Sequence, residues 1–200
     1  MPYEFLVDTY ATERLKVLGV WCAFRDEDLE VRPHPSDRRG RNLREHMVHQ
    51  CVGEDGWFRK MLGIDVGAPP LPEEETRLAF IQRYAEDSRK RSQALRGRED
   101  LWWREEAPFF EVVRSRAWIL VRRIAHTAHH RGQQTALLRM LGRDVWSTYG
   151  PTADTGGLPT DGAPTQYPYP DEASLLAGEA GGAGKRPLPG PGPGPCTERG

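Results

Sequence analysis

The sequence predicts an all-α protein, a four-helix bundle followed by a largely disordered C-terminal tail. Four segments carry apolar residues three and four positions apart, the spacing of a helix with one buried face. The last fifty residues hold 10 of the 17 prolines and 11 of the 21 glycines. Such a segment cannot bury enough apolar surface to offset its chain entropy. We therefore expect a bundle domain over residues 1–158, a tail over residues 159–200, and little β-structure.

The first two predicted helices span residues 3–24 and 42–62. No proline interrupts the first, and the polar, proline-containing stretch over residues 25–40 ends it. We interpret the basic run over residues 38–41 as part of a solvated loop. Asn42 is a favourable N-cap for the second helix, whose apolar residues cover a wide arc. That breadth is typical of an inner helix of a bundle.

Two glycines, Gly53 and Gly56, lie inside the second predicted helix. Each destabilises a helix by about 1 kcal/mol relative to alanine. Both lie within about 40° of His49 on a helical projection. We favour close helix packing as their explanation, and the alternative is space for a ligand above a metal ion.

The other two predicted helices span residues 73–97 and 111–141. The first of these is acidic at its start, basic toward its end and densely charged, which favours a position on the outside of the bundle. Aromatic residues gather over residues 100–110, where we expect a loop that either caps the core or lines a pocket. Gly142 provides a stop for the last helix.

Two histidines near the end of the last helix are candidate metal ligands. Three of the six histidines fall between His126 and His130. The side chains of His126 and His130 project about 40° apart on one helix face, with Cβ atoms about 6 Å from each other. Two imidazoles at this spacing can bind one metal ion. Thr127 occupies the position where zinc proteases carry a general-base glutamate, which disfavours that class of enzyme.

The second helix supplies candidates for a third ligand. His46 or His49 can provide it, because bundles build metal sites from facing helices. Three histidines and one open position are the arrangement in which a metal activates a bound water or thiol. A carboxylate from Glu45 or Glu54 in place of one histidine would favour iron.

Charge and composition exclude several classes of function. The formal net charge is −1, with 28 basic and 29 acidic residues, so no general positive field attracts nucleic acid or membranes. No apolar run approaches the roughly 18–20 residues of a membrane span, and the first residues are unlike a secretory signal. The three widely spaced cysteines favour the reducing cytoplasm over a disulfide framework.

Two motifs carry a resemblance to a known family. The segment H-T-A-H-H-R-G-Q (His126 to Gln133), together with H-M-V-H-Q-C-V-G-E-D-G-W-F (His46 to Phe58), resembles the DinB/YfiT-like superfamily of bacterial metal-binding four-helix bundles. The order of helices extends the resemblance over residues 1–155. It implies a divalent metal, zinc, nickel or iron, bound by one histidine of the second helix and two of the last.

Carried onto this sequence, the resemblance implies His126 and His130 as two of the metal ligands. The spacing to a following glutamate and aromatic residue favours His49 as the third ligand, with His46 as the alternative. His129 is then expected to pack beside the site rather than bind the metal. Gln133, about 20° from His126 on the helix, is a candidate for orienting a ligand. We expect Arg131 to form a salt bridge or a contact in a homodimer.

Members with known activity resemble thiol-dependent S-transferases and isomerases. The resemblance therefore implies an enzyme that joins a low-molecular-weight thiol cosubstrate to a small electrophile, with catalytic residues that the sequence does not identify. A metal-dependent hydrolase is the first alternative. The second is a non-catalytic stress-response protein in which the metal is structural. We expect a small-molecule substrate and neither nucleic acid nor membrane as a partner.

Overall fold

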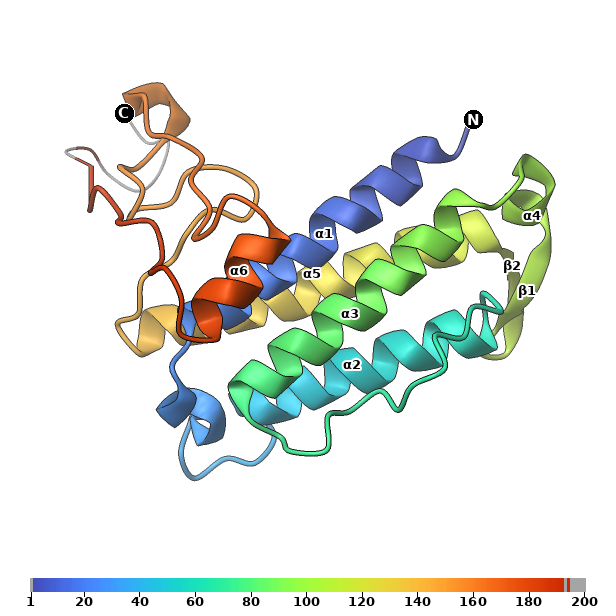
Figure 1. Ribbon diagram of the computed structural model, residues 1–200, viewed down its shortest axis with the longest axis horizontal. Helices are drawn as coiled ribbons and strands as arrows, with labels where there is room; N and C mark the ends of the chain where they lie inside the picture. The colour runs from blue at the N-terminus through green and yellow to red at the C-terminus, as the bar shows by residue number, and fades with distance from the viewer. Residues whose placement is uncertain (1, 193, 195–200) are drawn as a thin grey trace.

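Four long helices form a bundle in the computed structural model, which describes residues 2–192 and 194 (Figure 1). They are α1 (Glu4–Ala23), α2 (Leu43–Lys60), α3 (Arg77–Arg96) and α5 (Arg116–Met140). The shorter elements are η1 (Asp26–Glu30), α4 (Asp100–Arg104), β1 (Glu106–Phe109), β2 (Val112–Ser115), η2 (Pro159–Asp161) and α6 (Glu172–Glu179). The predicted four-helix bundle is confirmed.

Side-chain caps set where the long helices begin. Asn42 caps α2 as predicted, because its side chain accepts a hydrogen bond from the amide of Glu45 while the Glu45 carboxylate accepts from the amide of Asn42. Thr76 caps α3 and Ser115 caps α5. These two helices therefore begin four to five residues later than the sequence predicts.

A β-hairpin occupies residues 106–115, where the sequence predicts a loop and the start of a helix. Strands β1 and β2 pair in antiparallel register, with Phe109 opposite Val112. The prediction was wrong here because aromatic and β-branched residues on both sides of a two-residue turn favour paired strands over a helix. Phe110, in that turn, adopts a φ of 52°. The hairpin and α4 lie at the end of the bundle that holds the N-terminus (Figure 1).

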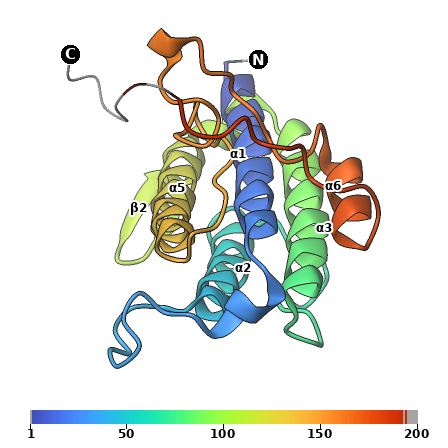
Figure 2. The same cartoon turned by 90° about the vertical axis from the view of Figure 1, so that its left-hand side faces the viewer.

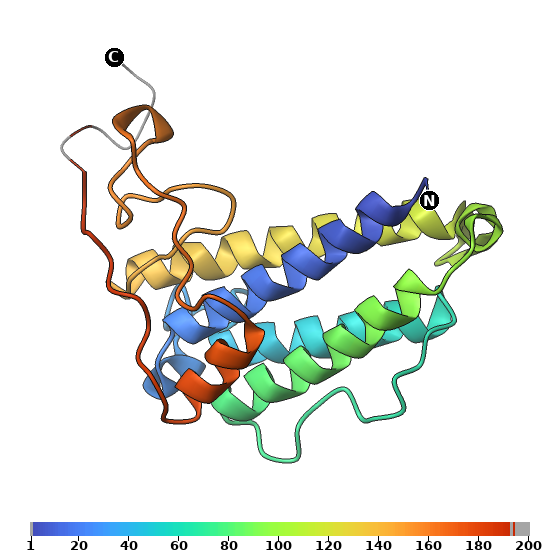
Figure 3. The same cartoon turned by 45° about the horizontal axis from the view of Figure 1, so that its top comes forward.

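The helices α2 and α3 run in the same direction. Their connection, residues 61–76, passes back along the outside of the bundle before α3 begins (Figure 3). Viewed along the bundle, α1 lies between α3 and α5, and α2 closes the arrangement against the same two helices (Figure 2). The arrangement therefore places α2 and α5 side by side, although they are distant in sequence.

Charged side chains divide the core of the bundle into two apolar parts. One part contains residues such as Trp21, Met47 and Tyr84, and the other contains Phe58 and Ile119. Between them lie two buried carboxylates and two buried guanidinium groups, which we name the charged layer. Its members are Glu54, Asp55, Arg91 and Arg123. Buried charges are stable only when they are paired, so this layer requires mutual contacts.

Glu54 provides most of those contacts. It accepts hydrogen bonds from the hydroxyls of Tyr10 at 2.6 Å and Tyr84 at 3.1 Å. Its carboxylate lies 3.5 Å from Nη1 of Arg91 and 3.6 Å from Nη2 of Arg123. Burial and the neighbouring Glu54 carboxylate raise the pKa of both tyrosines well above its ordinary value, so they remain neutral donors. One carboxylate thus connects all four long helices.

The predicted tail contains an ordered helix within its described part. Helix α6 lies against α1 and α3 (Figure 2). Leu175 is only 5% exposed, and Arg77 binds the Glu179 carboxylate at 2.5 Å. This short run of helix-forming residues between the proline-rich stretches buries an apolar side and gains ion pairs, which composition alone does not reveal. Residues 193 and 195–200 of the predicted tail lie outside the described residues.

The cysteines and the membrane-spanning potential of the helices bear on two expectations from the sequence. Cys22 and Cys51 are buried free thiols, and Cys196 lies outside the described residues. Burial raises the pKa of both described thiols. Within the described part of the chain, no helix has the length and apolar character needed to cross a membrane.

The docking of α6 gives a first prediction. Leu175→Ala removes a buried side chain and is expected to lower the free energy of unfolding by about 2 kcal/mol or more. Leu101→Ala is the matched control, because Leu101 is 67% exposed, and it is expected to change stability by less than about 0.5 kcal/mol. Urea denaturation measures both. Equal effects of the two substitutions would show that α6 is not packed against the bundle.

The charged layer gives a second prediction. Glu54→Gln leaves two buried guanidinium groups without their shared carboxylate, and the free energy of unfolding is expected to fall by about 3–5 kcal/mol. Asp37→Asn breaks an ion pair with Arg39, whose side chain is 91% exposed, and is expected to change stability by at most about 1 kcal/mol. A Glu54→Gln protein as stable as the control would contradict a role for this layer in stability.

Candidate metal centre

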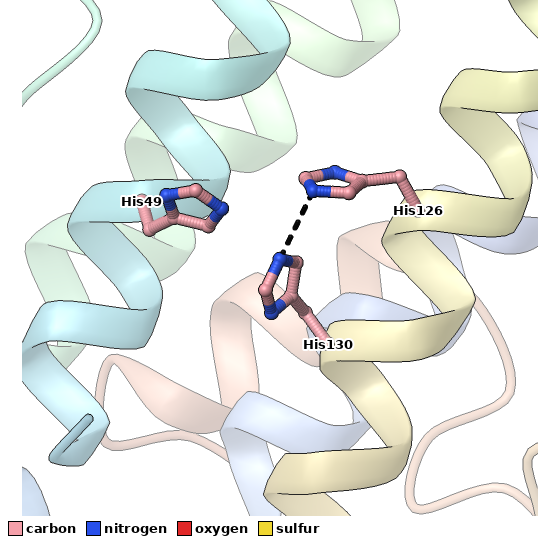
Figure 4. A group of neighbouring side chains, drawn as sticks. All are labelled: His49, His126 and His130. Carbon is pink, nitrogen blue, oxygen red and sulfur yellow. Dashed lines mark hydrogen bonds between the residues drawn. The ribbon is translucent and has the colours of Figure 1, made fainter. Parts of the chain in front are cut away.

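The histidines of α5 lie as the sequence spacing predicts. The side chains of His126 and His130 project from one face, and their Nε2 atoms are 3.2 Å apart (Figure 4). Two nitrogens bound tetrahedrally to zinc at about 2.0–2.1 Å lie about 3.4 Å from each other. The observed separation therefore fits two ligands of one metal ion.

His49 reaches the same point from α2, across the bundle (Figure 4). One ring nitrogen from each of His49, His126 and His130 can be chosen so that all three lie within 4.8 Å of one another. The centroid of the His49 ring lies 4.5 Å from that of His130 and 5.5 Å from that of His126. The structure thus brings together the three histidines that the resemblance implied.

His46 and the two candidate carboxylates lie outside this group of nitrogens. The ring centroid of His46 is 5.9 Å from that of His130, and its Nδ1 atom is buried without a hydrogen-bond partner among the described residues. Glu45 caps α2 and binds Arg32, while Glu54 belongs to the charged layer. The geometry therefore favours His49 as the third candidate ligand and gives no carboxylate ligand.

Hydrogen bonds to Nδ1 orient the rings of His126 and His130, the two candidate ligands on α5. The Nδ1 atom of His130 lies 2.9 Å from Oε1 of Gln133, so an Nδ1–H donates there and leaves Nε2 as the lone-pair atom. Gln133 therefore orients His130, although the sequence placed it closer to His126. Nη1 of Arg123 lies 3.3 Å from Nδ1 of His126. Because arginine can only donate, Nδ1 of His126 accepts this hydrogen bond. The proton of the neutral His126 ring is then on Nε2, which points toward Nε2 of His130.

An aromatic side chain holds His126 on another side. Trp57 stacks on the His126 ring, with centroids 5.8 Å apart and planes 16° from parallel. Trp57 in turn contacts Phe109 and Phe110 of the hairpin. Phe109 and Phe110 of the predicted loop therefore support His126 through Trp57, and neither lines the cavity beside it.

Gly53 makes room for Arg123 rather than for a ligand. A Cβ atom at Gly53 would lie 3.4 Å from Nη1 of Arg123, whereas one at Gly56 would have no neighbour within 4 Å. Close packing therefore explains Gly53, as the sequence analysis favoured. The structure gives no packing reason for Gly56.

Electrostatics keep the three histidines neutral. Burial, with smaller contributions from nearby arginines and histidines, lowers the pKa of His49 and His126 to about 4. The pKa of His130 is also lowered, again chiefly by burial. Neutral imidazole is the form that binds metals, so at pH 7 no ring carries a second proton that metal binding would have to release. Three neutral nitrogens suit zinc, nickel or iron, and the donor set fits a divalent ion.

A cavity of about 430 Å³ opens directly onto these rings. Its lining consists of Arg41, His49, Arg122, Ala125, His126, His129 and His130. A similar cavity of about 480 Å³ lies between α1 and residues 167–175, but no histidine or cysteine lines it. Of these two cavities, the first combines candidate metal ligands with space for a small molecule.

Sequence reasoning missed two arginines beside the site, Arg123 and Arg41. Arg123 stands three residues before His126, which was the available signal for a contact on the same helix face. Arg41 belongs to the basic run that was interpreted as a solvated loop, yet it lines the cavity. Arg131 forms a buried ion pair with Glu13 at 2.5 Å, which is the salt bridge expected for it.

Comparison with known proteins agrees with this architecture. The family model of the DinB family matches residues 5–159. A crystal structure of a DinB-like protein from Bacillus cereus superposes with a TM-score of 0.64 and 21% sequence identity, covering 73% of this chain and 97% of that one. At this identity the likeness concerns the fold. A search of curated proteins found no match. Since the family model spans the whole bundle, including both histidine motifs, the chain belongs to the DinB family.

Proposed function

We propose that the protein is a metal-dependent enzyme that transfers the sulfur of a low-molecular-weight thiol to a small electrophile. The observation that carries this proposal is the convergence of His49, His126 and His130 at the wall of an open cavity. Membership in the DinB family is compatible with a divalent metal at that place.

The donor set supports a catalytic rather than a buried structural metal. A metal held by three protein nitrogens would keep a further coordination position, and the cavity that the three rings line would give a small molecule access to it. Structural sites in proteins usually have four protein ligands. A divalent metal held there would act as a Lewis acid and lower the pKa of a thiol or water brought to it.

The chain's own residues would orient the histidine rings that hold the metal. Gln133 orients the ring of His130, and Trp57 stacks on that of His126. In the proposed reaction the thiol loses its proton to solvent at the cavity mouth. The sulfur lone pair forms the new carbon–sulfur bond, and the leaving group departs with the electron pair of the bond that breaks.

Hydrolysis is the second candidate reaction. The cavity is open to solvent and lined mostly by polar side chains, so water can reach the same position. In a hydrolase the electrophile would be attacked by water instead of a thiol. The two reactions share the histidine group and differ in the nucleophile that binds beside it.

Metal content provides the first test of this proposal. His49→Ala, His126→Ala and His130→Ala each remove a proposed metal ligand. Removing a residue that only hydrogen-bonds to a ligand typically weakens metal binding by about 10- to 100-fold, and each of these variants is expected to weaken it more. His34→Ala is the matched control, because His34 is exposed in a loop, and it should retain the wild-type metal content. His46→Ala decides between the two histidines of α2. Equal metal content in all variants would refute the ligand assignment.

Cobalt substitution tests the chemistry separately. A thiol that binds the cobalt-loaded protein is expected to add a sulfur-to-cobalt charge-transfer band, because the open position accepts the sulfur. A spectrum that no thiol changes, in a protein that retains its cobalt, would contradict thiol transfer and favour a hydrolase or a structural metal. A panel of ester and amide substrates then separates these two outcomes.

The histidine pKa values give a prediction of pH dependence. Protons compete with the metal only below the pKa of each ligand, and the pKa of both His49 and His126 is lowered to about 4. These two ligands should therefore cost little apparent metal affinity between pH 7 and about pH 5, and the lowered pKa of His130 should make its own loss begin below the pH expected for an ordinary imidazole. Ordinary imidazoles with a pKa of about 6.5 would lose about tenfold in affinity per ligand for each pH unit below that value. Chelator competition at each pH measures this, and a steep loss beginning near pH 6.5 would contradict it.

A further inference from the structure

The cavity beside the histidine group contains only neutral and positively charged side chains. Its lining consists of two arginines, four histidines and one alanine, and no carboxylate is among them. Arg41 precedes the N-cap of α2, and Arg122 lies one helical turn before His126 on α5. Arg41, from the loop just before α2, and Arg122, from α5, therefore both line the cavity beside the histidines.

Neither arginine forms a close ion pair. Most arginines of the bundle form ion pairs, such as Arg91 with Glu54, whereas within its described part the structure shows none for Arg41 or Arg122. Glu45 is bound by both terminal nitrogens of Arg32, and Arg41 acts on it only weakly, through its charge. A guanidinium group offers a planar fork of donors that matches a carboxylate or phosphate, so both side chains are free to bind an oxyanion.

The charge balance of the site also requires an anion. Three neutral imidazoles leave both positive charges of a divalent metal uncompensated, and the two free guanidinium groups add two more. Arg123 behind His126 belongs to the charged layer, in which Glu54 and Asp55 balance the two arginines. An anion that entered the cavity would gain attraction from every charged group lining it. A neutral molecule of the same shape would not.

We propose that the small molecule that binds in this cavity is anionic, and that Arg41 and Arg122 bind its carboxylate or phosphate while its reactive group lies against the histidines. This inference deepens the proposed function and rests on it for the identity of the reactive position. The cavity of about 430 Å³ suits a molecule of this kind, since small-molecule sites usually measure about 300–1,000 Å³.

Calorimetric titration of the full-length protein with matched probes tests the proposal. The probes are 3-mercaptopropionate, which carries a carboxylate, inorganic phosphate, and 2-mercaptoethanol, a neutral thiol of similar size. At least one anion is expected to bind about tenfold or more tightly than the neutral thiol, and the stronger anion identifies the preferred oxyanion. Equal affinity for all three probes would overturn the proposal.

Variants then locate the binding groups. Arg41→Gln and Arg122→Gln are each expected to weaken binding of the preferred anion by about tenfold while leaving the neutral thiol unaffected. Arg38→Gln is the matched control, because Arg38 is an exposed arginine of the same loop that does not line the cavity. If the anion preference survives both substitutions, the anion binds the metal alone and the proposal is wrong.

Failure of the proposed function would appear in a different measurement. Calorimetry detects anion binding whether or not sulfur reaches a metal, whereas the cobalt charge-transfer band reports only sulfur at the metal. Arginine-dependent anion binding without a thiol band would support an anionic ligand and contradict thiol transfer. A thiol band with no dependence on charge or on either arginine would support thiol chemistry and overturn the anionic ligand.

Discussion

The carboxylate of Glu54 lies between Arg91 and Arg123 in the middle of the bundle, with no exposure to solvent. Two tyrosine hydroxyls donate to the same carboxylate, so one group from α2 connects all four long helices. Arg123 extends this contact to His126. The position of a candidate metal ligand at the surface therefore depends on a pair of charges in the core.

This dependence explains why a small bundle carries so many buried charges. Replacing a buried ion pair with apolar residues is often neutral or stabilising, so such a pair is poor evidence for stability alone. Here the arginine contributes something that an apolar side chain cannot, since it directs a hydrogen bond to Nδ1 of His126. If Nε2 of His126 binds a metal, the proton of that ring must move to Nδ1, where it faces another donor. Metal binding is thus expected to shift Arg123 toward Glu54.

Much of the fold and part of the site could be predicted from sequence. Helical periodicity and the Asn42 cap are local signals, and both led to elements that the structure contains. The spacing of His126 and His130 is likewise local, because four residues fix the angle between two side chains on any helix. The hairpin over residues 106–115 was missed because each of its strands has only four residues, which is too short to give a clear pattern in the sequence.

Other features depend on contacts between distant segments. The sequence shows that His46 and His49 both lie on α2, but it does not give the rotation of α2 relative to α5, which brings His49 into the group. The partnership of Glu54 with Arg123 likewise joins two helices whose packing no local pattern reveals. Arg41 resembles any solvated loop arginine until the fold places it beside the histidines. The order of α6 depends on burial against α1 and α3, which composition obscures.

X-ray absorption spectroscopy at the edge of the bound metal identifies the ligands of that metal. For the purified protein loaded with zinc and without added thiol, we predict three imidazole nitrogens at about 2.0–2.1 Å and one further oxygen ligand. The imidazole count should fall in the His49→Ala variant and remain at three in the His46→Ala variant. A spectrum with fewer than three imidazoles, or with a cysteine sulfur in the first coordination sphere, would contradict the account.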